Sequence, residues 1–215
     1  MRALMLDVVR LFEQASGTKV DIRFALTSVL QQEIEAGAAF DIALLPRPEL
    51  DALARAGKIA AGTPTDVTRS AVGLAVRAGA PKPDIGTVES FRRALLAAKS
   101  IAYSDGPSGA YIANLLQRLG IADDMKAKTT LTSRLVAEVV ADGEAELGMQ
   151  QIVALLPVKG ADLVGPLPAE LQNIIVYAAG LAPGAALNAV ARTFMAFLAT
   201  SEVADLIRGR GMEPA

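Results

Sequence analysis

Short apolar segments and helix-forming segments alternate along this chain, and short polar loops join them. The pattern is clearest in residues 101–120 (IAYSDGPSGAYIANLLQRLG), where the apolar segment 101–103 leads through a loop into a helix expected to begin near Ala110. One apolar stripe along this helix would consist of Ile112, Leu115, Leu116 and Leu119. Strands that alternate with helices at this spacing predict βαβ units around parallel strands, and therefore the α/β class.

The loop 104–109 (SDGPSG) has a composition suited to binding an anion. Its small residues let a ligand approach the backbone closely, and the first turn of the next helix offers unpaired N–H groups and a partial positive charge. A structural interpretation is also open, in which Asp105 or Ser108 caps the helix and Gly106-Pro107 turns the chain.

Composition excludes several classes of chemistry. The chain has 215 residues, of which 52% are hydrophobic, so it can bury the core of one large domain or of two lobes. Its net charge of −2 lacks the excess of positive charge that is typical of nucleic-acid-binding proteins, so we expect no nucleic-acid partner. With no cysteine and no histidine, it offers no thiol nucleophile, disulfide, histidine base or Cys/His metal site. We therefore expect no metal and no cofactor.

The first residues (MRALMLDVVRLFEQASG) predict an amphipathic helix that ends at Gly17. Asp7 and Arg10 interrupt its apolar residues and no small-residue cleavage site follows, so we do not expect a signal peptide. No apolar run reaches the roughly 18 residues of a membrane span. Because the chain opens in a helix without a preceding strand, we expect the first strand of the fold to lie upstream of Met1.

Other elements follow from β-branched and apolar runs bounded by glycine and proline. The expected strands are 18–24, 40–45, 69–77, 101–103, 129–131, 145–149 and 174–179, and the expected helices include 29–36, 49–56, 135–141, 188–198 and a last one capped by Ser201. Thr87 or the residue before it is expected to cap a helix that runs through 91–98.

The segment 78–84 (AGAPKPD) is the clearest internal boundary, because glycine and proline dominate it. We predict two α/β lobes, with lobe 1 formed by 1–76 and 178–215 and lobe 2 by 77–177. Two crossing segments would suit a hinge. Ligands of open parallel sheets lie outside the carboxyl ends of the strands, so the loops at 25–28, 104–109 and 150–151 would face one cleft. A single Rossmann-like domain with ordinary loops is the alternative.

Four further residues have two open interpretations each. Arg69 either binds an anion in bidentate fashion or forms a salt bridge, and Tyr177 either packs at the hinge or donates to a ligand. Asp41 and Asp105 are either caps or turn residues, or carboxylates that act as a base or bind a cation.

Taken in order, several segments resemble the periplasmic molybdate-binding protein family of the type II solute-binding proteins. They are 12–20 (FEQASGTKV), 26–45 (LTSVLQQEIEAGAAFDIALL), 53–59 (LARAGKI), 72–85 (VGLAVRAGAPKPDI), 101–121, 140–152 (VADGEAELGMQQI) and 194–214 (FMAFLATSEVADLIRGRGMEP). The resemblance implies two α/β lobes that close on a small anion, and a permease of an ABC importer as partner of a monomer. It implies a periplasmic location if an export signal lies upstream of Met1; as given, the chain has none, and a cytoplasmic location stays open.

The resemblance implies ligand contacts at Thr27 and Ser28, at Ser108 and Gly109, and at Gln150 or Gln151. Ser104, in the same loop as Ser108, is a further candidate for binding the ligand. The family has a Gly-Ser-Ser run where this chain has Thr27-Ser28, and a tyrosine near an acidic residue where it has Gln150-Gln151, so a small carboxylate is as suitable a ligand as molybdate. One branch that resembles this family is identified as aconitate isomerase, so the resemblance also implies an alternative function, the isomerisation of a small tricarboxylic acid. In that alternative Ser104 or Asp105 would move the proton. A transcriptional regulator is disfavoured because no basic helix-turn-helix precedes the lobes.

Overall fold

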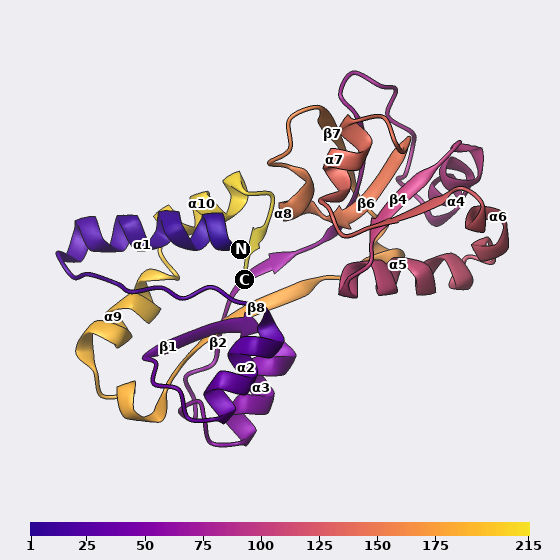
Figure 1. Cartoon of the computed structure of the whole chain (residues 1–215). Coiled ribbons are helices and arrows are strands. Elements are labelled where there is room, and N and C mark those ends of the chain that lie inside the picture. Colours follow the sequence, from indigo (N-terminus) through magenta and orange to yellow (C-terminus); the bar gives the residue numbers. More distant parts are fainter. The chain divides into compact units, whose positions relative to one another are not determined.

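A computed structural model describes residues 1–215, the side chain of residue 107 excepted. The chain divides into two units: unit 1 is Met1–Arg69 with Ile175–Ala215, and unit 2 is Ser70–Ile174. Each unit is built on one sheet flanked by helices (Figure 1). The predicted α/β class with two helix-flanked sheets is confirmed.

The sheet of unit 1 has the strand order β1-β8-β2-β9. Its strands are β1 (Ile42–Pro46), β2 (Thr65–Ser70), β8 (Ile175–Leu181) and β9 (Glu213–Pro214), and its helices are α1 (Arg2–Ser16), α2 (Thr27–Glu35), α3 (Arg47–Arg55), α9 (Ala189–Phe197), α10 (Ser201–Gly209) and the short 3₁₀ turn η2 (Pro183–Ala185). The β1–β8 and β2–β9 ladders are antiparallel. Parallel pairing, which the sequence predicts, is instead found in unit 2.

The sheet of unit 2 has the order β5-β4-β6-β3-β7. Its strands are β3 (Val72–Arg77), β4 (Ile101–Ser104), β5 (Thr129–Thr132), β6 (Leu147–Gln151) and β7 (Ala161–Pro166), and its helices are α4 (Val88–Ala97), α5 (Pro107–Arg118), α6 (Ala122–Lys126), α7 (Val136–Ala141), α8 (Ile152–Leu155) and the 3₁₀ turn η1 (Ala169–Leu171). Strand β4 runs parallel to β5 and β6, whereas β3 is antiparallel to β6 and β7.

Helix α1 forms because its apolar residues recur on one face, and all five that are buried lie on that face (Leu4, Met5, Val8, Val9 and Phe12). It ends at Gly17, whose φ of 69° places it in the left-handed conformation. The Phe12 ring packs edge-on against Phe194 and Phe197 of α9, with ring centroids 4.9 and 5.4 Å away. These contacts anchor α1 to the C-terminal part of unit 1.

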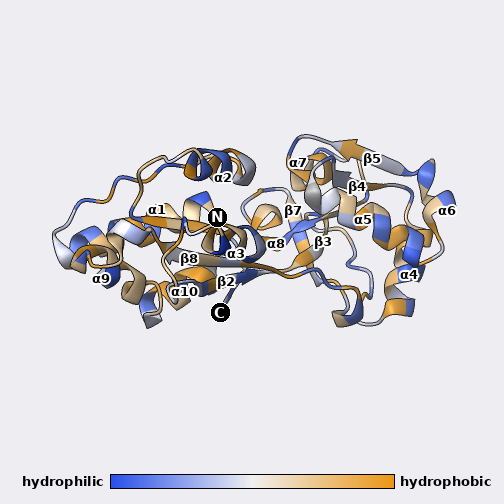
Figure 2. Ribbon diagram, turned by 90° about the horizontal axis from the view of Figure 1, so that it is seen from below, coloured by the Kyte–Doolittle hydropathy of each residue, from blue (hydrophilic) through white to orange (hydrophobic). Residues whose placement is uncertain are grey.

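Both faces of the unit 2 sheet are covered, and β4 shows how its sequence serves both. Ile101 and Tyr103 pack into the cluster that contains Phe91 of α4 and Leu115 of α5, whereas Ala102 packs into the cluster of α7. This alternation is the period of two expected for a strand. In Figure 2 the helices of unit 2 carry both orange and blue residues.

The strand predicted for 18–24 is wrong, because these residues have no ladder partner among those that the structure describes. Their backbone is bound by side chains at the end of α1 instead. The amide of Val20 donates to a carboxylate oxygen of Glu13 (2.9 Å), and that of Thr18 donates to the Ser16 hydroxyl (3.1 Å). Local side-chain acceptors have replaced a neighbouring strand.

The expected single strand 69–77 is two strands in two sheets, interrupted at Ala71. All of β3 pairs with β6 and β7 of unit 2. The chain therefore passes from one unit to the other at 69/70 and 174/175, whereas the boundaries predicted from the sequence are 76/77 and 177/178.

Gly73 explains the close packing of β3: a Cβ there would lie 2.6 Å from Ile152 Cγ1 and 3.0 Å from the Gly165 carbonyl oxygen.

Three predicted helix starts can be compared with the structure. Thr87 caps α4 as expected, since its hydroxyl accepts from the Ser90 amide at 3.1 Å. Helix α5 begins at Pro107, with Gly106 as N-cap, so neither Asp105 nor Ser108 caps it. Proline at the first position needs no N–H partner, which explains the earlier start. The last helix is preceded by Thr200 and not capped by Ser201.

Candidate functional site

Three parallel strands of unit 2 end in polar residues at the same edge of the sheet. These residues are Ser104 at the end of β4, Thr132 at the end of β5 and Gln150 near the end of β6. Because the carboxyl ends of parallel strands lie side by side, this edge is where open α/β sheets bind ligands. We call these three strand ends, together with the first turn of α5, the polar edge of unit 2.

The start of α5 is held tightly against the end of β4. The Ser104 and Ser108 hydroxyl oxygens are 2.9 Å apart. Gly109 packs so closely that a Cβ built on it would lie 1.5 Å from the Ser104 carbonyl oxygen. The structure therefore brings together Ser104, Ser108 and Gly109, and it shows that only glycine fits at position 109. The first N–H groups of α5 have no partner inside the helix.

Gln150 and Gln151 point to different places. The Gln150 side-chain oxygen accepts from the Val136 amide at the start of α7 (3.1 Å), which leaves its amide N–H groups as donors. The Gln151 amide faces Ser70: with its nitrogen toward that residue it donates to the Ser70 hydroxyl (2.8 Å) and to the carbonyls of Ser70 and Ala71 (3.1 and 3.2 Å). Gln151 thus ties β6 to the segment between β2 and β3.

The charged residues near the polar edge are exposed or compensated. The Asp105 side chain is exposed, and its backbone amide donates to the Thr132 carbonyl (3.0 Å). Arg134 follows β5 and is surrounded by Glu138, Asp142 and Glu144. Three carboxylates outweigh its single positive charge, so hydroxyl and amide groups are the donors that this edge offers an anion.

The predicted residues of unit 1 lie at the start of α2 and on two strands. Thr27 is half-buried and Ser28 exposed in the first turn of α2, which follows an extended Leu26 that is not a hydrogen-bonding cap. Arg69 is exposed on β2, where it lies opposite Glu213 of β9. The structure shows where each lies, and their contact with a ligand stays a prediction.

Tyr177 lies at the carboxyl end of β1, because the β1–β8 ladder pairs it with Pro46. Burial raises the pKa of its phenol, and the negative charge of Glu49 raises this pKa further. Glu49 is in the first turn of α3, directly after Pro46. Its Oε2 atom is buried and has no hydrogen-bond partner in the part of the chain that the structure describes.

Glu49 is not among the residues predicted from the sequence. A signal for it was present, since the run 44–50 (LLPRPEL) places a carboxylate three residues after the end of a buried strand. Nothing in that run shows that the carboxylate is half-buried and unpaired. The neighbouring Arg47, in contrast, is paired with Asp51 (2.8 Å) and Asp66 (2.7 Å).

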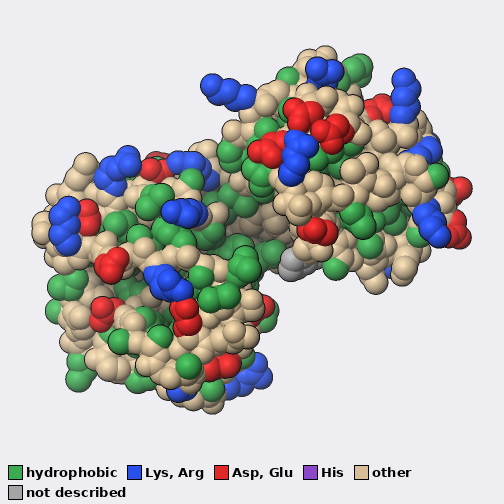
Figure 3. Space-filling model, viewed as in Figure 1, with side chains coloured by type: hydrophobic (Ala, Val, Ile, Leu, Met, Phe, Trp, Pro, Cys, Tyr) green, Lys and Arg blue, Asp and Glu red, His purple; other side chains and the backbone are tan. Residues whose placement is uncertain are grey.

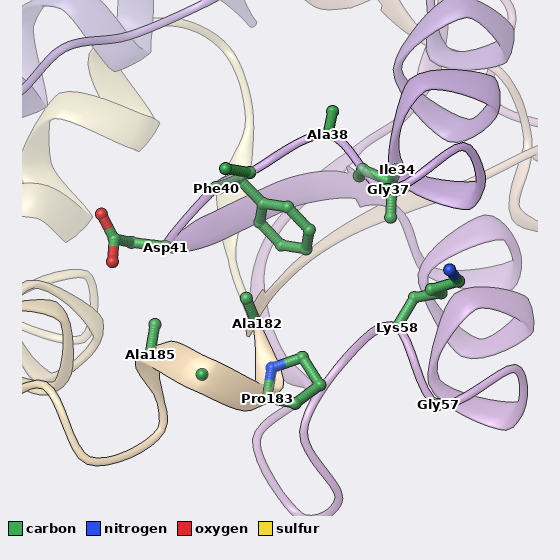
Figure 4. Close-up of a pocket in the computed structure, with 12 residues that line it drawn as sticks. Ile34, Gly37, Ala38, Phe40, Asp41, Gly57, Lys58, Ala182, Pro183 and Ala185 are labelled. Atoms are coloured by element: carbon green, nitrogen blue, oxygen red, sulfur yellow. The ribbon is translucent and has the colours of Figure 1, made fainter.

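A cavity of about 310 Å³ opens in unit 1, and of the predicted residues it is lined by Asp41. Its walls include Ile34, Phe40, Lys58 and Pro183. Figure 4 shows the Phe40 ring and Pro183 facing the space, with Asp41 and Lys58 pointing away from it on opposite sides. Asp41 lies just before β1 and contacts the Asn188 amide (3.5 Å), so this cavity is at the amino end of β1. It is mainly apolar and not suited to a small anion.

The charged groups of the chain are spread out. Figure 3 shows side chains of both signs interspersed over the face that it presents. Within residues 1–215, apart from the side chain at 107, no group of three or more acidic residues is placed to hold a metal ion. None of the described helices has both the length and the apolar character that a membrane crossing requires.

Comparison with known proteins supports one family. The family described as bacterial extracellular solute-binding protein matches residues 1–213. An aconitate isomerase from a Pseudomonas species is 33% identical over 97% of this chain and 82% of its own length.

Solved structures agree on the fold. A substrate-binding domain assigned to a molybdenum ABC transporter of Clostridium difficile has a TM-score of 0.87 at 18% identity, covering 100% of this chain and 94% of that one. The periplasmic molybdate-binding protein of Azotobacter vinelandii has a TM-score of 0.71 at 19% identity, covering 98% and 94%. PEB3 of Campylobacter jejuni with bound L-phospholactate has a TM-score of 0.69 at 14% identity, covering 98% and 94%. The fold is that of the type II periplasmic binding proteins, and the chain belongs to the bacterial extracellular solute-binding protein family.

Proposed function

We propose that this protein binds a small anion, either an organic carboxylate or a tetrahedral oxyanion, at the polar edge of unit 2. The observation that carries the proposal is the Ser104–Ser108 hydroxyl pair at the start of α5, which Gly109 holds against the end of β4. Hydroxyls and backbone N–H groups in the first helical turn form an anion-binding site made of uncharged donors. Such a site explains how a chain with a net charge of −2 binds an anion.

Further contacts are part of this proposal. The Gln150 amide nitrogen is the donor that remains after its oxygen has bonded to α7. Gly109 would contribute its backbone N–H, and Thr27, Ser28, Arg69 and Tyr177 are the donors that unit 1 would contribute. Gln151 is a weaker ligand residue than the sequence suggested, because its amide already bonds to Ser70 and Ala71.

The family supports a role in import. We propose that the two lobes trap the anion and deliver it to the permease of an ABC importer, outside the cytoplasm. Supporting this role, solved proteins with this fold include a molybdate-binding protein and a protein bound to L-phospholactate. The identity of the anion, the compartment and a monomeric state are parts of the proposal.

A thermal-shift panel tests the proposal. Molybdate, sulfate, phosphate and a series of di- and tricarboxylates would each be added to the purified protein. A ligand present at 100 times its Kd adds about 2.7 kcal/mol to the unfolding free energy. For a chain of this size that is roughly 5–10 °C in Tm. No shift with any of these anions would refute the proposal.

A second function, isomerisation of a small tricarboxylic acid, is favoured by one observation: the aconitate isomerase that is 33% identical over 97% of the chain. With neither histidine nor cysteine, the proton-moving group must be a carboxylate, a lysine or a tyrosine. Asp105, with Ser104, is the candidate that the sequence suggested. The test is whether cis- and trans-aconitate interconvert in the presence of the protein, followed by ¹H NMR.

A further inference from the structure

Glu49 is the feature of unit 1 that the binding function leaves unexplained. Its Oε2 atom is buried without a hydrogen-bond partner among the described residues. A buried carboxylate oxygen without a donor costs free energy, so in a stable protein it calls for an explanation. Capping does not explain it, because α3 is not capped by a side-chain hydrogen bond. Nor does an ion pair, since Arg47 is already engaged by Asp51 and Asp66.

The position of Glu49 is that of a ligand-binding group. It follows the carboxyl end of β1 by three residues, and ligands of α/β sheets lie outside such strand ends. It is also in the first turn of α3. A carboxylate oxygen that accepts no hydrogen bond keeps a lone pair free to take a proton.

Tyr177 provides the complementary group. It lies opposite Pro46 in the β1–β8 ladder, at the same strand end. Burial raises the pKa of its phenol, and the negative charge of Glu49 raises this pKa further. Tyr177 therefore stays protonated at neutral pH and acts as a hydrogen-bond donor. A proton acceptor at the start of α3 and a proton donor on β8 thus lie at the same end of β1.

We propose that Glu49 is the base, and Tyr177 the hydrogen-bond donor, of an isomerase site in unit 1 that moves a proton between two carbons of an unsaturated tricarboxylate. This inference rests on the isomerase function proposed above and replaces Asp105 as its base. Asp105 is exposed, and water competes for its lone pairs, whereas the Glu49 side chain is half-buried.

The step is balanced without any further reactant. Aconitate has a methylene group next to its double bond. The Glu49 carboxylate takes a proton from this methylene carbon, and the C–H electron pair forms a new C=C bond to the central carbon. The electrons of the old double bond take a proton back from the Glu49 carboxyl group at the other terminal carbon. In D₂O this is the proton just removed or, once the carboxyl group has exchanged with solvent, a deuteron. The negative charge that develops on the adjacent carboxylate is stabilised by the Tyr177 hydroxyl. Because the former double bond becomes a single bond, either geometry can form on return.

The experiment follows trans-aconitate in D₂O by ¹H NMR with the full chain. The wild-type protein is expected to interconvert the two isomers and to exchange methylene hydrogen for deuterium. Glu49→Gln keeps the shape of the side chain and is expected to lower both rates by about 100-fold or more. Tyr177→Phe is expected to lower them by about 100-fold, as loss of one stabilising donor does. Glu35→Gln removes an exposed carboxylate from α2 of the same unit and serves as the matched control with unchanged rates.

Binding of trans-aconitate is measured on the same samples by thermal shift, and circular dichroism checks that each variant is folded. Wild-type rates in Glu49→Gln, or loss of turnover in Asp105→Asn with retention in Glu49→Gln, would overturn the assignment and leave the isomerase function standing. Binding without any interconversion by the wild type would overturn both and leave the binding function intact. If Glu49→Gln does not fold, Glu49→Asp and Tyr177→Phe decide the question, because wild-type rates in both would overturn the assignment.

Discussion

The carboxyl ends of the strands differ between the two units in what they offer a ligand. In unit 2, three parallel strands end in hydroxyl and amide groups, and the nearby Arg134 is neutralised by three acidic residues. In unit 1, Glu49 follows the end of β1 and has a buried Oε2 without a hydrogen-bond partner among the described residues, and Tyr177 lies opposite Pro46 at the same strand end. The first arrangement suits holding an anion, and the second suits moving a proton.

The difference follows from how each sheet is paired. Strands β5, β4 and β6 run in parallel, so three helix starts and three strand ends come to one edge. In unit 1, β8 runs antiparallel to β1, so the start of β8 lies beside the end of β1 and brings a tyrosine there. Antiparallel pairing thus joins residues that are more than 120 positions apart in sequence (Pro46 and Tyr177).

The largest effect is expected for Gly109→Ala. The new Cβ would lie 1.5 Å from the Ser104 carbonyl oxygen, a backbone atom, so the start of α5 would have to move away from β4. We expect a loss of about 4 kcal/mol or more of unfolding free energy and loss of anion binding, measured by urea unfolding and thermal shift. Gly106→Ala is the control, since its Cβ would have only the Ser104 hydroxyl nearby, at 4.0 Å. Equal stability of the two variants would contradict this account of the polar edge.

The hydroxyls of the two units provide the next contrast. Ser108→Ala removes a half-buried hydroxyl that contacts Ser104 Oγ, whereas Ser28→Ala removes an exposed one at the start of α2. A hydrogen bond to a charged ligand contributes about 1.5–3 kcal/mol, so we expect Ser108→Ala to weaken anion binding by at least tenfold, measured by calorimetry. Ser28→Ala should have the smaller effect. A larger loss of affinity in Ser28→Ala than in Ser108→Ala would indicate that the anion binds at the start of α2 in unit 1 and not at the polar edge of unit 2.

A smaller effect on stability is expected for Gln150→Ala. Without the side-chain oxygen of Gln150, the Val136 amide at the start of α7 loses its acceptor. We expect a cost of about 1 kcal/mol in the unfolding free energy, together with weaker anion binding, because a donor of the polar edge is lost. Gln117→Ala, at an exposed position on α5, should change stability by less than about 0.5 kcal/mol.

The smallest effect concerns the tyrosines at high pH. Burial raises the pKa of Tyr103 above its ordinary value of 10.0, and burial together with the Glu49 charge does the same for Tyr177. Each phenol holds its proton more tightly in the folded state, so its contribution to stability is complete below pH 10 and is lost as the pH rises through the folded-state pKa. We expect absorbance at 295 nm to show late ionisation, and Tyr177→Phe to reduce the fall in Tm above pH 10. A fall in Tm that is the same in Tyr177→Phe and wild type would show that the phenol of Tyr177 does not hold its proton more tightly in the folded state.

Local patterns in the sequence predicted the place of the loop 104–109 at the end of a strand. The loop 104–109 is bounded by an apolar strand and an amphipathic helix, so its place at a strand end depends on neighbouring residues alone. Gln151 and Glu49 could not be assigned in this way. The first is turned toward Ser70 and the second is left unpaired by α3 and β8, and both depend on segments distant in sequence. The segment 18–24 has the composition of a strand, but composition does not provide a neighbour with which to pair.

The insertion of unit 2 within unit 1 also determines the order in which the protein can assemble. Every residue of unit 2 lies in one continuous stretch, Ser70–Ile174, so all of its partners have been synthesised before β8 emerges. Unit 1 pairs Ile42 with Leu181 and Thr68 with Pro214. Its first 69 residues therefore cannot complete their sheet until the C-terminal segment 175–215 has been synthesised, and apolar surface on α1 and β1 stays uncovered until then. During synthesis, unit 2 is therefore the first unit that can be completed. Unit 1 stays incomplete for longer and is more exposed to aggregation and to chaperones.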